Sequence, residues 1–117
     1  MSLITVVIPS VRYEALEVVR KCLHRQTFNN FETIVVSPFK YGPCDMWVQD
    51  PPKREGDYYS LNKAWNKAFK RAFGKLIVSI VDGIWFPPDT LDKLWKHYED
   101  DPTSCVTTIG HQYDRME

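Results

Sequence analysis

Four polar side chains of this sequence follow short apolar runs: Ser10, Arg12, Ser37 and Asp82. If the runs are parallel strands, their carboxyl ends meet at one edge of a sheet, where open α/β sheets bind ligands. One carboxylate, two hydroxyls and a guanidinium suit a polar ligand that carries phosphates or hydroxyls. Also predicted at this edge are Pro9, Pro38, Gly83 and the segment 110–113 with His111.

The hydrophobic pattern predicts the elements that position these groups. Runs rich in β-branched residues predict strands at 3–8, 31–36, 75–81 and 104–109, with a shorter one at 46–48. Apolar residues three and four apart predict helices at 14–26 and 60–73, and a third one that begins at the cap Asp89-Thr90 and ends at Asp101-Pro102. This order predicts an α/β fold with three layers, α/β/α, around a mostly parallel sheet.

The spacing also predicts which helix residues face the core. For the first helix these are Ala15, Val19, Cys22 and Leu23. For the second they are Leu61, Ala64, Trp65, Ala68, Phe69, Ala72 and Phe73.

Composition indicates one globular domain over residues 1–117. Hydrophobic residues make up 44% and charged residues 26%, and the formal net charge is zero, which argues against a nucleic-acid-binding protein. No apolar run reaches the roughly 18 residues that a transmembrane helix needs, and no signal peptide is recognisable. Three unpatterned cysteines favour reduced thiols, so we expect a cytoplasmic protein.

Several familiar nucleotide and hydrolase motifs are missing from the sequence. It has no G-x-G-x-x-G after the first strand, no G-x-x-x-x-G-K-[ST] and no G-x-S-x-G. A receiver-type signalling domain of similar length would need clustered acids after the first strand, where this chain has Pro9-Ser10. These observations disfavour the classical dinucleotide fold, the P-loop, the α/β-hydrolase and the receiver domain.

Three segments resemble family 2 glycosyltransferases of the GT-A fold, and together they cover nearly the whole chain. ITVVIPSVRYEALEVVRKCLHRQTFNNFETIVVS resembles the opening strand, the nucleotide-facing loop, the helix ending in Gln-Thr and the second strand. SLNKAWNKA resembles a helix start of the pattern G-x-x-x-A-R-N-x-G and keeps Ala64 and Asn66. LIVSIVDGIWFPPDTLDKL resembles the strand, the D-x-D motif and the W-F-x-P-D helix start of the family.

The resemblance implies a nucleotide-sugar-binding domain of a glycosyltransferase, which moves a sugar from a nucleoside diphosphate to an acceptor. The residues that it places around the nucleotide sugar are Pro9, Ser10, Arg12, Ser37, Asn66 and Asp82. It also implies Mg²⁺ or Mn²⁺ on the diphosphate, with Asp82 as metal ligand and the cation neutralising charge on the leaving group. The acceptor and the catalytic base are not assigned.

The sequence departs from the D-x-D motif. Aligned on Trp85, the two acids of the motif fall on Val81 and Gly83, and only the middle position, Asp82, is acidic. Structural roles are the alternatives for several residues: a turn carboxylate for Asp82, a solvated loop residue for Arg12, surface polarity for Asn66, core packing for Trp85 and Phe86, and a helix cap for Asp89.

Two kinds of protein therefore stay open. The family's second half, with the acceptor site, has no counterpart in these residues, so the chain is expected to be part of a longer enzyme or a minimal relative. The alternative is a catalytically inactive domain of the same fold, which binds a nucleotide or serves as an interaction module. Apolar surface left by a shortened sheet would then favour self-association.

Overall fold

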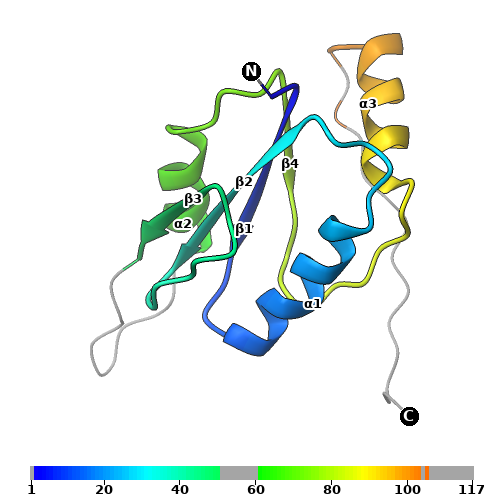
Figure 1. Cartoon of the computed structure of the whole chain (residues 1–117). Coiled ribbons are helices and arrows are strands. Elements are labelled where there is room, and N and C mark those ends of the chain that lie inside the picture. Colours follow the sequence, from blue (N-terminus) through cyan, green and yellow to red (C-terminus); the bar gives the residue numbers. More distant parts are fainter. Residues whose placement is uncertain (1, 51–60, 104, 106–117) are drawn as a thin grey trace.

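The computed structural model describes residues 2–50, 61–103 and 105. Its strands are β1 (Ile4–Pro9), β2 (Phe31–Ser37), β3 (Met46–Gln49) and β4 (Leu76–Ser79). Its helices are α1 (Tyr13–His24), α2 (Leu61–Phe69) and α3 (Thr90–Asp100), as Figure 1 shows. Of the predicted strand 104–109 only residue 105 is described, and the segment 110–113 with His111 lies outside the described residues.

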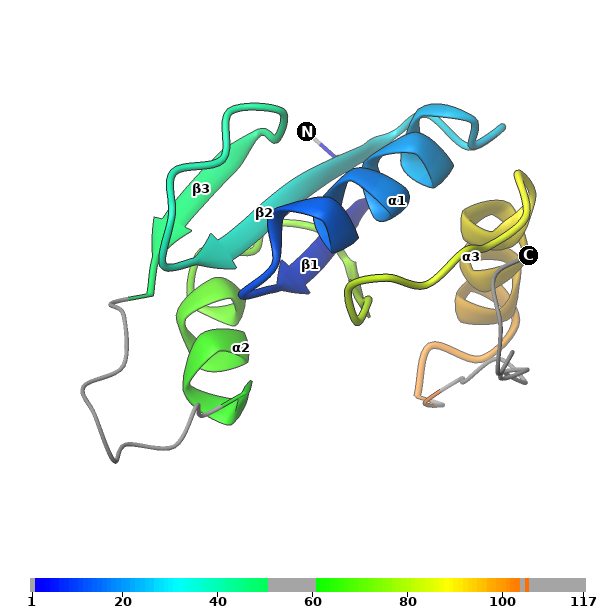
Figure 2. The same cartoon turned by 90° about the horizontal axis from the view of Figure 1, so that it is seen from below.

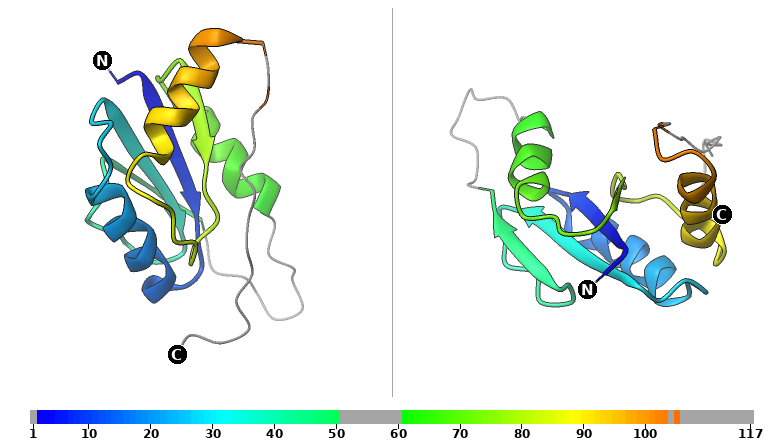
Figure 3. Two further views of the ribbon diagram at one scale, coloured as in Figure 1. Left: turned by 90° about the vertical axis from the view of Figure 1, so that its right-hand side faces the viewer. Right: turned by 90° about the horizontal axis from the view of Figure 1, so that it is seen from above.

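The four strands form one parallel sheet in the order β3-β2-β1-β4. Helix α1 covers one face of this sheet and α2 covers the other (Figures 2 and 3). The predicted α/β fold with three layers is therefore confirmed. Each face needs its own apolar cover because a parallel sheet is buried on both sides.

Strand β1 lies in the middle of the sheet and supplies both cores. On the α1 face, alternate residues of β1 pack with the helix: Ile4, Val6 and Ile8 belong to the same cluster as Leu16 and Val19. On the α2 face, Val7 packs with Ile34, Val36, Val48, Ala64 and Ala68. The two helices can lie close to the sheet because small or branched residues face it.

Helix α1 was predicted with one incorrect core residue. Its buried residues are Leu16, Val19, Cys22 and Leu23, whereas the predicted Ala15 is only partly buried. Leu16, Val19 and Leu23 are spaced i, i+3, i+7, and Ala15 lies about 100° away from Leu16 around the helix. Because leucine is more apolar than alanine, α1 is rotated about its axis so that Leu16, and not Ala15, faces the core.

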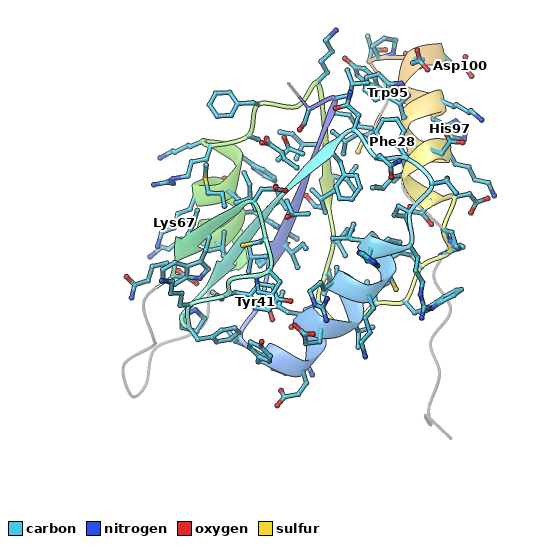
Figure 4. All side chains as sticks on the ribbon, in the orientation of Figure 1. Phe28, Tyr41, Lys67, Trp95, His97 and Asp100 are labelled. Carbon is cyan, nitrogen blue, oxygen red and sulfur yellow. The ribbon has the colours of Figure 1, made fainter. Side chains whose placement is uncertain are left out.

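Gln26 connects α1 to α3. Its side chain is 5% exposed, and its Nε2 donates to the backbone oxygens of Cys22 at 3.2 Å and Pro87 at 2.8 Å. Its Oε1 accepts a hydrogen bond from the backbone N–H of Leu91 at 3.0 Å. Nearby, the rings of Phe28 and Trp95 pack with their centroids 5.9 Å apart (Figure 4). One amide therefore binds the end of α1 to the first turn of α3.

Helix α2 is shorter than predicted. It ends at Phe69 instead of residue 73, and Phe69 and Phe73 are 38% and 69% exposed where burial was expected. The backbone N–H groups of Arg71 and Ala72 donate to oxygens three residues earlier, so the chain tightens into a turn. The apolar stripe of the sequence therefore extends beyond the helix.

A buried polar cluster holds the connection between α2 and β4. Thr5 is fully buried, and its Oγ1 accepts a hydrogen bond from the Gly74 N–H at 2.8 Å and donates to Glu32 Oε1 at 2.7 Å. The same Glu32 oxygen accepts from the Phe73 N–H at 3.2 Å. A Cβ on Gly74 would lie 2.5 Å from the Thr5 nitrogen, so only glycine fits this close approach.

Helix α3 begins as predicted but with a different cap. Asp89 is the N-cap residue, yet its side chain makes no capping hydrogen bond and instead pairs with Lys93 at 3.0 Å. This hydrogen bond lowers the pKa of the Asp89 carboxyl. Thr90 Oγ1 donates to the Pro87 oxygen at 2.9 Å.

None of the helices in the described part of the chain is long and apolar enough to span a bilayer.

Candidate functional site

The direction in which the chain moves across the sheet changes between β1 and β4. These strands are neighbours, but α1 leads from β1 toward β2, whereas α2 leads back across the sheet to β4. Such a change of direction is a topological switch point, and open α/β sheets bind ligands there, at the carboxyl ends of the strands. These ends lie near the start of α1, at the bottom of Figure 1.

Three of the predicted site residues meet at this point. Ser10 Oγ donates a hydrogen bond to Asp82 Oδ2 at 2.7 Å, although the two residues are 72 positions apart. The backbone N–H of Arg12 donates to Ser10 Oγ at 3.0 Å. The Arg12 guanidinium lies 3.4 Å from Asp82 Oδ1. We call Ser10, Arg12 and Asp82 the β1–β4 cluster.

Burial divides the roles within the β1–β4 cluster. Ser10 is 3% exposed, and the side chain of Asp82 is 12% exposed, whereas that of Arg12 is 66% exposed. The carboxylate is thus fixed in place by its neighbours, and the guanidinium extends from it into solvent. A ligand arriving at this edge meets the positive charge first.

A glycine turn aims Asp82 at Ser10. Gly83 has a φ of +77°, a conformation that side chains rarely adopt, and its N–H donates to the Ala15 oxygen in the first turn of α1 at 3.2 Å. On the other side of Asp82, Val81 is 46% exposed. The two flanking positions of the D-x-D motif therefore hold an exposed apolar side chain and a backbone turn.

Ser37 lies at the predicted edge, but its side chain faces the interior. It is fully buried, its hydroxyl donates to the Phe39 oxygen, and it accepts the indole N–H of Trp47 at 2.9 Å. The hydroxyl thus both donates and accepts within the protein, and the predicted place of Ser37 in the lining of a base and ribose pocket stays a prediction. Pro9, also buried, is the last residue of β1 and pairs with Val36.

Asn66 is not part of the β1–β4 cluster. It is exposed on α2, the helix whose buried face is formed by Ala64 and Ala68. Its predicted position near the nucleotide stays a prediction. The resemblance to a sequence pattern located the helix correctly, but a pattern does not fix the distance from a helix to the crevice.

Tyr13 is a candidate that the sequence did not single out. It directly follows Arg12, is 49% exposed, and packs against Phe39 and Tyr41 with centroid distances of 5.8 and 5.4 Å. An exposed ring held by two others offers a flat surface on which a base can stack. An aromatic residue at the predicted start of a helix, next to polar loop residues, was the available signal.

Next to Tyr13, the buried Tyr41 belongs to a hydrogen-bond network with the partly exposed Glu17 and Arg20. Tyr41 is 2% exposed and donates to Glu17 Oε1 at 2.8 Å, while Arg20 donates to Glu17 Oε2 at 2.6 Å. Burial, together with the hydrogen bond to Glu17, raises the pKa of the Tyr41 hydroxyl above its ordinary value. The two hydrogen bonds from Arg20 and Tyr41 lower the pKa of Glu17.

This network predicts a loss of stability at alkaline pH. A raised folded-state pKa means that the contribution of Tyr41 is complete below its unfolded pKa of about 10 and is lost as the pH rises above it. Tyr41→Phe should cost about 1 kcal/mol at neutral pH and should make the decline above about pH 10 shallower. Urea unfolding over a series of pH values measures both effects, and equal alkaline slopes in the two proteins would contradict the assignment.

The donor set at the cluster does not fit the divalent cation that the resemblance implies. In the described part of the chain, no group of three or more His, Cys, Asp or Glu side chains lies close enough together to hold a metal. Asp82 is the one acid of the cluster, and its two oxygens face Ser10 and Arg12. A guanidinium at this carboxylate repels a cation, so the arrangement makes Asp82 a poor metal ligand.

A separate cavity lies along α1, away from the β1–β4 cluster. It has a volume of about 190 Å³ and a mostly apolar floor. Its polar lining residues are Arg20, His24, Thr33, Tyr41 and Asp45. No residue of the β1–β4 cluster lines it, so the cavity and the cluster are separate sites.

The parallel four-strand sheet and the helices on its two faces match a GT-A-like glycosyltransferase fold. Solved structures of S. aureus TarS, a GT-A-like glycosyltransferase, share it. Residues 1–349 of TarS in complex with UDP-GlcNAc align with a TM-score of 0.65 at 19% identity, over 86% of this chain and 32% of that one. The complex with UDP gives the same values. A longer TarS structure gives a TM-score of 0.67 at 17% identity, over 86% of this chain and 20% of that one.

The similarity is one of fold and covers part of the neighbour. This chain spans about a third of TarS 1–349. The sequence matches no protein-family model and no curated protein.

Proposed function

We propose that this domain binds a nucleoside diphosphate sugar at the carboxyl ends of β1 and β4, as the donor-binding part of a glycosyltransferase. The observation that carries the proposal is the β1–β4 cluster, which joins a carboxylate, a hydroxyl and an exposed guanidinium at the topological switch point. Its support from other proteins is the shared fold of TarS, which has been solved with UDP-GlcNAc and with UDP.

Each residue of the site has a separate task in this proposal. Tyr13 stacks on the base, Asp82 accepts a hydrogen bond from a ribose hydroxyl, and Arg12 binds the diphosphate. Ser10 positions Asp82 through the 2.7 Å hydrogen bond. Pro9 and Ser37 shape the floor of the edge from the interior, where both are buried. Transfer to an acceptor, metal assistance, self-association and a cytoplasmic location stay predictions of the sequence.

A second candidate is donor binding without transfer. It is favoured by the single acid at the cluster, since Val81 and Gly83 replace the two acids of the D-x-D motif. Hydrolysis of a UDP-sugar or its transfer to an added acceptor would exclude this candidate.

Calorimetry with UDP, GDP and UDP-GlcNAc tests the proposed site. Asp82→Asn keeps the shape of the side chain but removes its charge, and it should weaken binding of the preferred nucleotide about tenfold to a hundredfold. Asp92→Asn is the matched control, because Asp92 pairs with Lys96 on the surface of α3. Equal affinities of the wild type and Asp82→Asn, or no binding of any nucleotide, would refute the proposal.

A further inference from the structure

We infer that Arg12, instead of a divalent cation, neutralises the diphosphate of the nucleotide at the β1–β4 cluster. The inference rests on the proposed function, since it concerns how the same site recognises its ligand. It reverses the expectation that Asp82 serves as a metal ligand. Three features of the described residues carry it.

The first feature is the supply of ligand atoms for a cation. Mg²⁺ and Mn²⁺ prefer carboxylate oxygens, and a single carboxylate leaves most of the coordination shell to water and phosphate. Here that carboxylate is 12% exposed and accepts the Ser10 hydroxyl at 2.7 Å. The side chain of Val81 offers no ligand atom, and Gly83 has no side chain.

The second feature is the geometry of Arg12. One Nη lies 3.4 Å from Asp82 Oδ1, and the side chain is 66% exposed, so most of its five N–H donors face solvent at the sheet edge. A guanidinium binds two oxygens of a phosphate at once, and Asp82 holds it where a phosphate would arrive. Asp82 thus orients the group that binds phosphate, in addition to its contact with the ribose.

The third feature is the balance of charge. Asp82 and Arg12 cancel, but the carboxylate is mostly covered, at 12% exposed, and the guanidinium side chain is 66% exposed. A divalent cation would approach a carboxylate that is already paired, past the guanidinium that repels it, whereas a diphosphate is attracted. Helix α1 begins at Tyr13 beside this edge, and the positive end of its dipole acts in the same direction.

The test is calorimetric UDP binding with EDTA and with Mn²⁺, using wild type, Arg12→Gln, Arg12→Lys and Arg25→Gln. Arg25 is the control because it is an exposed arginine at the other end of α1. We expect the wild type and Arg25→Gln to bind UDP equally well in both conditions. Arg12→Gln should lower the affinity about tenfold to a hundredfold. Arg12→Lys should lower it less, because lysine keeps the positive charge but cannot bind two phosphate oxygens through paired N–H donors.

Uridine separates the phosphate contact from the rest of the site. Its affinity should be the same in the wild type and Arg12→Gln, because it has no phosphate. UDP binding that disappears in EDTA, returns with Mn²⁺ and is unchanged in Arg12→Gln would overturn the inference and leave the proposed function standing. Failure of UDP, GDP and UDP-GlcNAc to bind in either condition would overturn the proposed function, and the inference with it.

Discussion

Gly74→Ala is expected to lose about 3 kcal/mol of its free energy of unfolding, a large part of the 5–15 kcal/mol typical of a domain. The added Cβ would lie 2.5 Å from the Thr5 nitrogen, 2.7 Å from the Ile4 carbonyl carbon and 2.7 Å from Thr5 Oγ1. Two of these atoms belong to the backbone of the central strand, so they cannot move aside by a change of rotamer. Relief requires β1 and the turn before β4 to separate, which breaks the hydrogen bond between Gly74 and Thr5.

Urea unfolding followed by far-UV circular dichroism measures this loss. Gly42→Ala is the matched control: a Cβ there would meet nothing within 4 Å, so its stability should change by less than about 0.5 kcal/mol. If Gly74→Ala unfolds at the same urea concentration as Gly42→Ala, the close approach of the turn to β1 is wrong.

Gln26→Leu is expected to cost about 2–4 kcal/mol. Leucine keeps the volume of the side chain but leaves the Leu91 N–H and the Pro87 oxygen without the partner that Gln26 gives them. Because the site is buried, water cannot easily replace the lost hydrogen bonds. The damage should be concentrated at the start of α3, which Gln26 holds to α1.

Amide hydrogen exchange locates this effect. The Leu91 amide should exchange faster in Gln26→Leu, while amides in the middle of β1 should change only as much as the global stability. Gln49→Leu is the control, since Gln49 is exposed at the end of β3. Unchanged protection of Leu91 in Gln26→Leu would contradict the role of Gln26 as the link between the two helices.

The sheet could be predicted because its strands are buried on both faces. Runs of β-branched residues such as those of β1 and β2 have few alternatives in a chain of this length, and the described strands start and end within two residues of the predicted positions. Helix α2 was predicted too long because its apolar spacing continues to Phe73. The spacing gives no sign that Gly74 must pack closely against β1. Tertiary contacts ended the helix where the local pattern would have continued it.

The candidate site was predictable in position more than in detail. Parallel strands bring their carboxyl ends together, so Ser10, Arg12 and Asp82 could be expected at one edge. The inward orientation of Ser37 could not, because it depends on Trp47, ten residues away and on a neighbouring strand. The exposed ring of Tyr13 was missed for a similar reason: Phe39 and Tyr41 come from a loop with no regular pattern.

Strand β1 carries a polar cluster beside each of its ends, and the two clusters separate two kinds of evolutionary constraint. Thr5, with Glu32 and Gly74, holds the turn before β4 against the strand. Ser10, with Arg12 and Asp82, forms the proposed ligand site. Under the proposed function, a substitution at the Ser10 end would change what is bound and leave the hydrogen bonds at the Thr5 end intact. Such a division would allow one scaffold to acquire new specificities over generations at one end of a strand, while the other end keeps the fold.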